Sequence, residues 1–175
     1  NYCLGSNAGA VCAPSRATLL TGKHSHLNGM IDNGGMFNHD QQQFQKILRQ
    51  HGYQTAAFVS SFVLEPSFGL ARGFDSYDPP RAPHGTGLLS PVSPEALERS
   101  CAETSTQAID WLKTRDKRPF FLWVHYLDPH FPYRPPEPWR DEYQGDAFHK
   151  PEPKIVLDRT KVKRVTGAIG RYLYA

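Results

Sequence analysis

Apolar residues in the segment 40–59 follow helical spacing first and then form a short unbroken run. A helix is predicted between a capping-box-like start at Asp40 and Gln43 and a stop at Gly52, where a left-handed residue is favoured. Its apolar face is the set of residues that recur at helical spacing: Phe44, Ile47, Leu48 and His51. The next apolar run, 55–59, predicts a short buried strand.

A second helix–strand pair is predicted further along the chain. The longest helix is expected to begin at Ser93, with Pro94 in its first turn, and to be broken at Lys117. Its buried stripe is again a set of residues at helical spacing: Leu97, Cys101, Ala108, Trp111 and Leu112. The run Phe120–Val124 is apolar on both faces, which is typical of a central strand covered by helices.

This order of elements predicts an α/β fold with a largely parallel sheet, because strands linked by helical crossovers pair in parallel. Two proline-rich segments, 78–94 and 129–138, predict loops between the regular elements. In such sheets, functional groups gather in the loops that follow the carboxyl ends of strands. The segment 125–133 follows the second strand and concentrates polar and titratable residues, so we expect a site there.

The composition is that of a globular chain with no bilayer-spanning run. Of its 175 residues, 39% are hydrophobic and 12% aromatic, which excludes a disordered chain. The net charge of +3 is not gathered into one run, so a nucleic-acid partner is not indicated. The longest purely apolar run, 120–124, is too short to cross a membrane. Because the chain starts at Asn1 and stops at Ala175 inside a helix-like stretch, we expect a piece of a longer protein.

The cysteines and histidines do not match a disulfide framework or a zinc site. Cys3, Cys12 and Cys101 are odd in number and have no C-x-x-C spacing, and Cys101 is expected to be a small core residue. His125 and His130 are five residues apart with Pro129 between them, unlike the helical pair of an H-E-x-x-H site. We therefore expect neither a zinc enzyme nor a disulfide scaffold.

The segment 12–22 carries the strongest chemical signal. Pro14 at a first helical position and Gly22 at the end predict a short helix with Cys12 at its amino end, where backbone N–H groups favour an anion. Arg16 lies four residues after Cys12, and its guanidinium suits a tetrahedral oxyanion. On these residues alone two interpretations stay open: an anion-ester site, or a buried thiol beside a surface charge.

The same segment resembles the signature of the formylglycine-dependent sulfatases, within the alkaline-phosphatase-like superfamily. That signature is C-x-P-S-R followed by A-x-L-L-T-G, which residues 12–22 match. Further matches follow in the order of the family: T-G-K at 21–23, R-G-F-D at 72–75, P-F-F-L at 119–122 and D-P-H at 128–130. The resemblance implies a partial alkaline-phosphatase-like fold, with residues 1–175 forming part of one sulfatase catalytic domain.

The resemblance also implies a mechanism. A maturation enzyme would oxidise Cys12 to formylglycine, whose hydrate attacks the sulfur of a sulfate ester and later releases sulfate. Arg16 and His130 would be the other catalytic residues, while Lys23 and His125 are the candidate substrate-binding residues. A divalent cation, usually Ca²⁺ in this family, would bind formylglycine derived from Cys12. The substrate would be an aryl or carbohydrate sulfate ester, and relatives are often exported, periplasmic or lysosomal.

The sequence departs from the family pattern in two places. Family carboxylates that bind the metal precede and follow the cysteine, but no acidic residue lies among residues 1–11. Ca²⁺ takes about six to eight oxygen ligands, so Cys12 alone cannot hold it. Many relatives carry Lys-x-His after the first strand, whereas this chain has Val59–Phe62 near that place. We therefore expect residues 1–175 alone to be inactive.

Other functions remain open. A phosphonate or phosphate monoester hydrolase of the same superfamily can carry the same cysteine signature. A non-catalytic sulfated-glycan binder and a cysteine–histidine thiol enzyme are alternatives from other classes. An anionic polymer could contact the basic and aromatic residues of the late loop, although a solvated loop is favoured: Arg134, Trp139, Arg140, Tyr143 and Lys150.

The remaining histidines and Asp128 are expected to have structural roles or to face solvent. Asp128 precedes a proline and is expected to fix a turn, although it could be a metal ligand. The scattered histidines are expected to be structural or exposed to solvent: His24, His26, His39, His51, His84 and His149.

Overall fold

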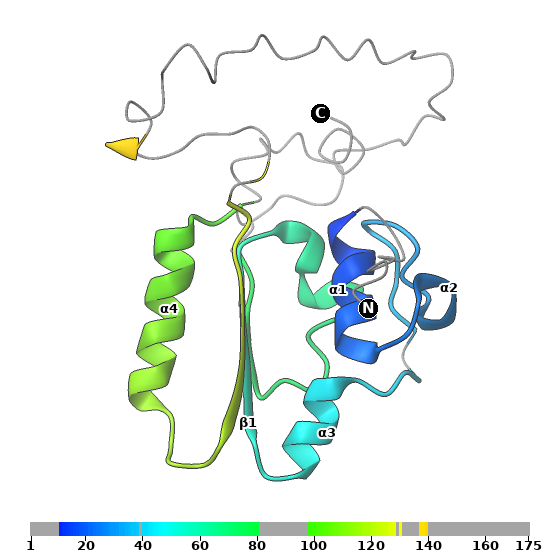
Figure 1. Cartoon of the computed structure of the whole chain (residues 1–175), viewed down its shortest axis with the longest axis horizontal. Coiled ribbons are helices and arrows are strands. Elements are labelled where there is room, and N and C mark those ends of the chain that lie inside the picture. The colour runs from blue at the N-terminus through cyan, green and yellow to red at the C-terminus, as the bar shows by residue number, and fades with distance from the viewer. Residues whose placement is uncertain (1–10, 39, 81–97, 129, 131–136, 140–175) are drawn as a thin grey trace, which may run out of the picture.

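The computed structural model describes residues 11–38, 40–80, 98–128, 130 and 137–139. Helices precede and separate three parallel strands along the chain, and Figure 1 shows the arrangement of these elements. In chain order the elements are α1 (Cys12–Thr21), α2 (Ser25–Asn28), α3 (Phe44–Gln50), β1 (Gln54–Val59), the 3-10 helices η1 (Phe62–Leu64) and η2 (Pro66–Phe68), β2 (Ser76–Asp78), α4 (Cys101–Thr114) and β3 (Phe120–His125).

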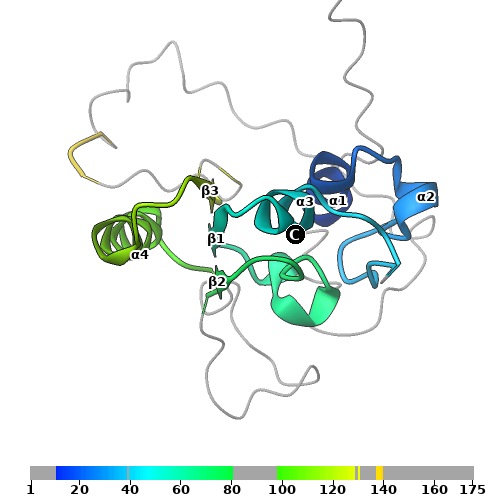
Figure 2. The same cartoon turned by 90° about the horizontal axis from the view of Figure 1, so that it is seen from below.

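The three strands form one parallel sheet in the order β2-β1-β3. Figure 2 shows α4 on one face of this sheet and α1, α2 and α3 on the other. The predicted α/β fold with a parallel sheet is therefore confirmed. Within the described sheet, however, β1 is the central strand and β3 is an outer one, contrary to the sequence prediction.

Side chains of β3 alternate between two hydrophobic clusters, so both of its faces are covered. Phe121 and Trp123 pack against the cluster that includes Ala13 and Ala17 of α1. Leu122 and Val124 pack with Phe58, Ala108 and Trp111 against α4. The apolar character of both faces therefore reflects helices on each side of the sheet, and it does not require a hydrogen-bonded strand at each edge.

β1 is buried along its whole length, which confirms the strand predicted at 55–59. The helix before it ends where expected, since Gly52 adopts a left-handed φ of 84° directly after the C-cap, His51. Its start differs, because α3 begins at Phe44 and Asp40 makes no capping contact there.

The predicted apolar face of α3 is also only partly correct. Phe44 and His51 are exposed, while Ile47 and Leu48 are half-buried. The buried residue of α3 is Gln45, which faces inward because its side-chain Nε2 donates to the carbonyl oxygen of Arg72 at 2.9 Å. A long-range hydrogen bond thus outweighs the helical apolar pattern.

α4 starts later than predicted. Residues 98–100 are not helical, and Glu98 forms an antiparallel bridge with Ser61. Ser100 is the N-cap, in a capping box where its Oγ accepts from the Glu103 N–H at 3.2 Å. The predicted start at Ser93 is therefore wrong, and Leu97 lies outside the described residues. Within the predicted stripe only Ala108 is fully buried; the others are half-buried or, at Leu112, exposed.

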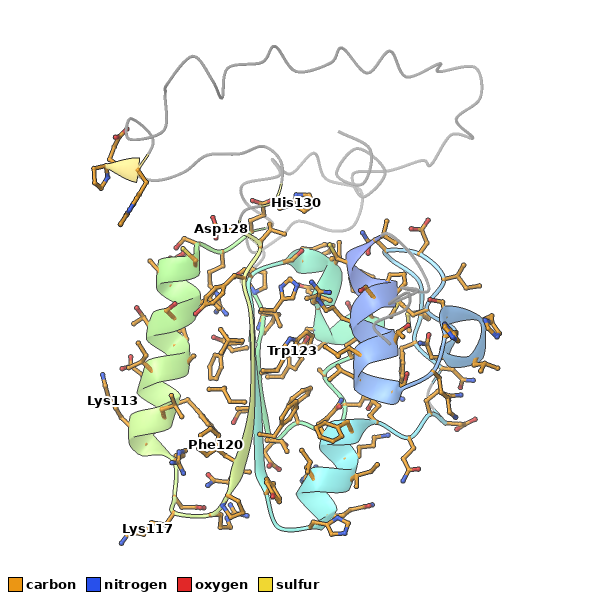
Figure 3. All side chains as sticks on the ribbon, in the orientation of Figure 1. Lys113, Lys117, Phe120, Trp123, Asp128 and His130 are labelled. Atoms are coloured by element: carbon orange, nitrogen blue, oxygen red, sulfur yellow. The ribbon has the colours of Figure 1, made fainter. Side chains whose placement is uncertain are left out.

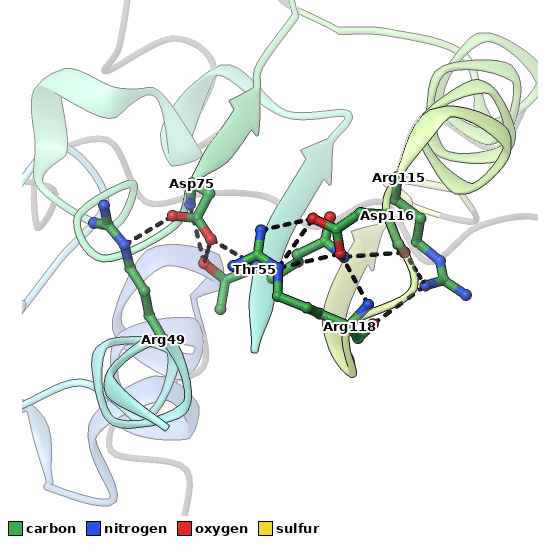
Figure 4. Close-up of polar contacts among 7 residues, drawn as sticks. Arg49, Thr55, Asp75, Arg115, Asp116 and Arg118 are labelled. Atoms are coloured by element: carbon green, nitrogen blue, oxygen red, sulfur yellow. Dashed lines mark hydrogen bonds and ion pairs between the residues drawn. The ribbon is translucent and has the colours of Figure 1, made fainter. Parts of the chain in front are cut away.

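Polar side chains join the amino ends of the three strands (Figure 4). Asp75, just before β2, accepts from the backbone N–H and the hydroxyl of Thr55 at 3.0 and 3.1 Å and pairs with Arg49 at 2.7 Å. Asp116, before β3, accepts from the side chains of Gln54 and Arg118. These contacts fix the amino edge of the sheet, which leaves the carboxyl edge for a site.

Several sequence predictions fall outside the described residues. They concern most of the two proline-rich loops and these side chains: Cys3, His39, His84, Arg134, Arg140, Tyr143, His149 and Lys150. Of the late loop, the structure describes residues 137–139, and Trp139 is exposed. In the described part of the chain, no helix is long and apolar enough to cross a membrane.

Candidate active site

The first turn of α1 places Cys12 beside the core that supports the sheet. α1 begins at Cys12, two residues before Pro14, with Val11 as an extended N-cap, and ends at the left-handed Gly22. Ala13 and Ala17 are fully buried, and the half-buried Cys12 packs against the same cluster. The predicted short helix is therefore present, and its buried alanines belong to the hydrophobic cluster against which Phe121 and Trp123 of β3 pack.

The backbone amides of this turn are less available to an anion than the sequence indicates. The N–H of Ala13 donates to the side-chain oxygen of Asn33 at 2.8 Å, and Pro14 has no N–H. A bound anion in this turn must therefore depend more on Arg16 than on the helix end. Sequence reasoning missed Asn33, because it caps the helix from a loop twenty residues away.

The positive charge of Arg16, on α1, acts on the imidazole of His125 at the end of β3. The Arg16 side chain is half-buried, and its guanidinium is 3.4 Å from the hydroxyl of Ser15. Burial of His125, and then the positive charge of Arg16, lower the pKa of His125 from 6.5 to about 4. The imidazole is therefore neutral at physiological pH and lies within electrostatic range of the guanidinium.

His125 ends β3 on the face that packs against α1. It is two residues after Trp123, whose ring meets the imidazole edge-on at a centroid distance of 5.9 Å. The backbone oxygen of His125 accepts from the N–H of Ser60 at 3.0 Å, which fixes its position against β1. His125 therefore lies in a fixed position at the edge of the sheet where the sequence predicts a site.

His130 and Asp128 lie in the loop beyond β3, at the carboxyl end of the sheet (Figure 3). The N–H of His130 donates to the carbonyl oxygen of Leu127 at 2.8 Å, so Asp128 lies within a turn, as predicted. Both side chains are exposed. Figure 3 places them at the opposite end of β3 from Phe120 and Lys117.

Lys23 is not brought together with Cys12. It follows the C-cap of α1, so the ten residues of the helix separate the two positions by about 15 Å. Its exposed ammonium donates to the side-chain oxygen of Gln41 at 2.8 Å. His24, His26 and His51 are exposed, as expected.

The segment 59–62, where the sequence lacks the Lys-x-His pattern, ends β1 beside His125. The Ser60 hydroxyl is 2.7 Å from that of Thr104 on α4, so Ser60 faces away from α1. Arg99 donates to the carbonyl oxygen of Val59 at 3.1 Å and pairs with Asp78 at 2.7 Å, which joins the carboxyl ends of β1 and β2. Sequence reasoning found neither contact, since both link distant segments.

The described residues do not fit a calcium site by themselves. Among them, no group of three or more histidine, cysteine, aspartate or glutamate side chains lies close enough to hold a metal ion. The donor at the start of α1 is the sulfur of Cys12, whereas Ca²⁺ takes oxygen ligands. Oxygen ligands for a cation at this end would have to come from elsewhere in the protein.

The buried imidazole predicts a specific loss of stability in acid. Because the pKa of His125 is about 4 in the folded state and 6.5 when unfolded, only the unfolded chain gains the proton as pH falls between these values. The free energy of unfolding should therefore fall by about 3 kcal/mol from pH 7 to pH 4 through this residue. Denaturant unfolding at both pH values should show that this fall is absent from a His125→Phe variant. Parallel losses in both proteins would contradict the prediction.

The chain is similar to two curated sulfatases. It is 36% identical over 158 residues to the N-acetylglucosamine-6-O-sulfatase of Bacteroides thetaiotaomicron, covering 85% of this chain and 27% of the relative. It is 26% identical to human iduronate 2-sulfatase, covering 83% of this chain and 32% of that protein. The chain therefore spans about a third or less of the length of these relatives.

Solved structures share the fold. A protein in complex with its substrate D-glucosamine-2-N,6-O-disulfate matches with a TM-score of 0.55 and 34% identity, over 73% of this chain and 27% of that one. The phosphonate monoester hydrolase of Agrobacterium radiobacter matches with a TM-score of 0.57 and 22% identity, over 77% of this chain and 35% of that one. At that identity, the second match shows the fold alone.

The family model named Sulfatase matches residues 5–166, which is most of the chain. This match includes the cysteine signature, the strands and the histidine loop described above. Together with the 36% identical relative, it shows that the chain belongs to the sulfatase family.

Proposed function

We propose that this chain is part of the catalytic domain of a sulfatase and supplies the nucleophile for sulfate ester hydrolysis from Cys12. The observation that carries this proposal is the position of Cys12 in the first turn of α1, with Arg16 one turn further on and within electrostatic range of His125, the last residue of β3. Membership of the sulfatase family supports this role for Cys12, because the family match over residues 5–166 includes the cysteine signature.

The proposed chemistry splits hydrolysis into two steps. A maturation enzyme first converts Cys12 to formylglycine, which takes up water to form a geminal diol. One hydroxyl of the diol loses its proton and attacks the sulfur while the S–O bond to the leaving group breaks, so the sulfuryl group is held covalently and the leaving group takes up a proton to depart as an alcohol. The second hydroxyl then loses its proton as the bond to sulfate breaks, which releases sulfate and restores the aldehyde.

Arg16 and His130 have separate roles in this proposal. The guanidinium of Arg16 offsets the negative charge of the sulfuryl oxygens and orients the diol. His130, exposed in the loop after β3, hydrogen-bonds to the ester oxygen or protonates the leaving alcohol. Calcium belongs to the proposal through the family resemblance alone.

The substrate class that the relatives favour is a carbohydrate sulfate ester. One relative is named for N-acetylglucosamine 6-O-sulfate chemistry, and the substrate-bound structure holds a disulfated glucosamine. An aryl sulfate is the other class that the sequence left open. We assign no role to Lys23 in the proposed reaction, because it follows the end of α1 opposite to Cys12 and donates to Gln41.

Relative turnover of matched esters tests the proposed function against the phosphonate and phosphate ester alternative. A protein of full sulfatase length that contains this chain should hydrolyse an aryl sulfate at least about 100-fold more efficiently than the matched phosphonate monoester. Steady-state kcat/KM for both esters gives this ratio. A ratio below one would favour a phosphonate ester hydrolase instead.

A further inference from the structure

The His125 imidazole is a buried polar group without a described partner. The residue is only 6% exposed, and neither ring nitrogen has a hydrogen-bond partner among the described residues. Buried polar side chains are usually hydrogen-bonded, because losing water without replacing its hydrogen bonds is unfavourable. A buried imidazole without a described hydrogen-bond partner indicates that a bound ligand supplies the missing hydrogen bond.

Ser61 is a second such group on the same face of the sheet. It is fully buried, and its hydroxyl has no hydrogen-bond partner in the described structure. Ser60 contacts Thr104 on the α4 side, and the backbone of Ser61 is extended, with φ −121° and ψ 134°. Since side chains alternate along an extended backbone, Ser61 faces the α1 side, as His125 does.

The surroundings of His125 hold the ring rigidly and give it a positive neighbour. Trp123 contacts the imidazole edge-on, and it is itself stacked on Phe74 at a centroid distance of 6.1 Å. Tyr77 packs against Trp123 and donates its hydroxyl proton to the Leu64 carbonyl oxygen at 2.6 Å. Arg16 supplies the nearby charge. A neutral donor beside a guanidinium suits one oxygen of a singly charged tetrahedral group.

We propose that His125 is a substrate-binding residue that donates a ring N–H to a sulfuryl oxygen of the ester, with the Ser61 hydroxyl as a second contact on the same face. This inference rests on the proposed function, since it names residues that would hold the sulfate group there. The contact comes from the ends of two neighbouring strands, and it complements Arg16 from α1. It also gives the unpartnered imidazole and hydroxyl a common reason to be buried.

Variants of a full-length protein that contains this chain test the contact. His125→Phe should raise the KM for an aryl sulfate and the Ki for inorganic sulfate by about 10-fold or more, while Tm stays the same or rises. Inorganic sulfate needs no chemical step, so its Ki reports binding alone. His125→Gln, which keeps an N–H donor, should recover part of the affinity. Ser61→Ala should raise the same Ki by about 3-fold or more.

Ser60→Ala is the matched control, because Ser60 is adjacent, equally buried and already bonded to Thr104. It should lower Tm and leave the Ki for sulfate unchanged. A His125→Phe variant with lower Tm and unchanged Ki would overturn the proposal and assign His125 to the core. Unchanged Ki in both His125→Phe and Ser61→Ala would overturn it as well.

Failure of the contact and failure of the proposed function give different results. If the protein without substitutions hydrolyses aryl sulfate but His125→Phe leaves the Ki for sulfate unchanged, the contact is wrong and the function stands. If it does not hydrolyse aryl sulfate but its Ki for sulfate depends on His125, the function is wrong and the contact stands.

Discussion

Replacing Cys12 with alanine should reduce kcat for sulfate ester hydrolysis by about 10⁴-fold or more in a full-length protein that contains this chain. The reason is that alanine offers no atom that can be converted to the attacking hydroxyl. Steady-state rates with an aryl sulfate measure the effect. The KM of any remaining activity should change much less, since Arg16 and the other binding groups are kept.

Cys101 provides a closely matched control for this substitution. Both cysteines are free, half-buried thiols, and each is the first residue of a helix. Cys101→Ala should therefore leave kcat within about twofold, because α4 lies on the opposite face of the sheet from α1. Equal losses in the two variants would show a general effect on folding and contradict a chemical role for Cys12.

Replacing Arg16 with glutamine should lower kcat/KM by about 10²- to 10³-fold. Its guanidinium is a donor one turn into α1, where the Ala13 amide is already bonded to Asn33 and Pro14 lacks an N–H. Arg16→Lys should recover only part of the loss, since an ammonium cannot make the two parallel hydrogen bonds of a guanidinium. Kinetics of the three proteins with one aryl sulfate provide the comparison.

Lys23→Gln removes the same charge at the other end of α1 and serves as the control. Its kcat/KM should stay within about threefold, because Lys23 is exposed and bonded to Gln41. An equal loss in both variants would mean that long-range charge, and not a local contact with the ester, accounts for the effect of Arg16.

Local sequence signals correctly predicted the ends of two helices and the position of one strand. Gly52 and Gly22 stop helices as expected, and the run at 55–59 forms a buried strand. The predicted helix start at Ser93 rested on Pro94, whereas α4 begins after the capping box that Ser100 and Glu103 form. Competing start signals need tertiary structure to decide between them.

Long-range contacts account for the remaining differences. Gln45 is buried because its amide bonds to Arg72, which no helical pattern encodes. Asn33 caps α1 from a distant loop in the same way. The electrostatic interaction of Arg16 with His125 depends on the tertiary structure that places α1 on the same side of the sheet as His125, although the strand pattern had placed His125 at the correct edge of the sheet. Helix length alone places Lys23 far from Cys12.

The most direct test of the account is the mass of residue 12 in the active protein. Peptide mass spectrometry of a full-length protein, made in a host with the maturation enzyme, should show a loss of ~18 Da at Cys12, as conversion of the thiol to an aldehyde requires. The converted fraction should rise and fall with sulfatase activity across preparations. Full activity in a preparation whose Cys12 keeps its thiol and reacts with alkylating agents would contradict the account.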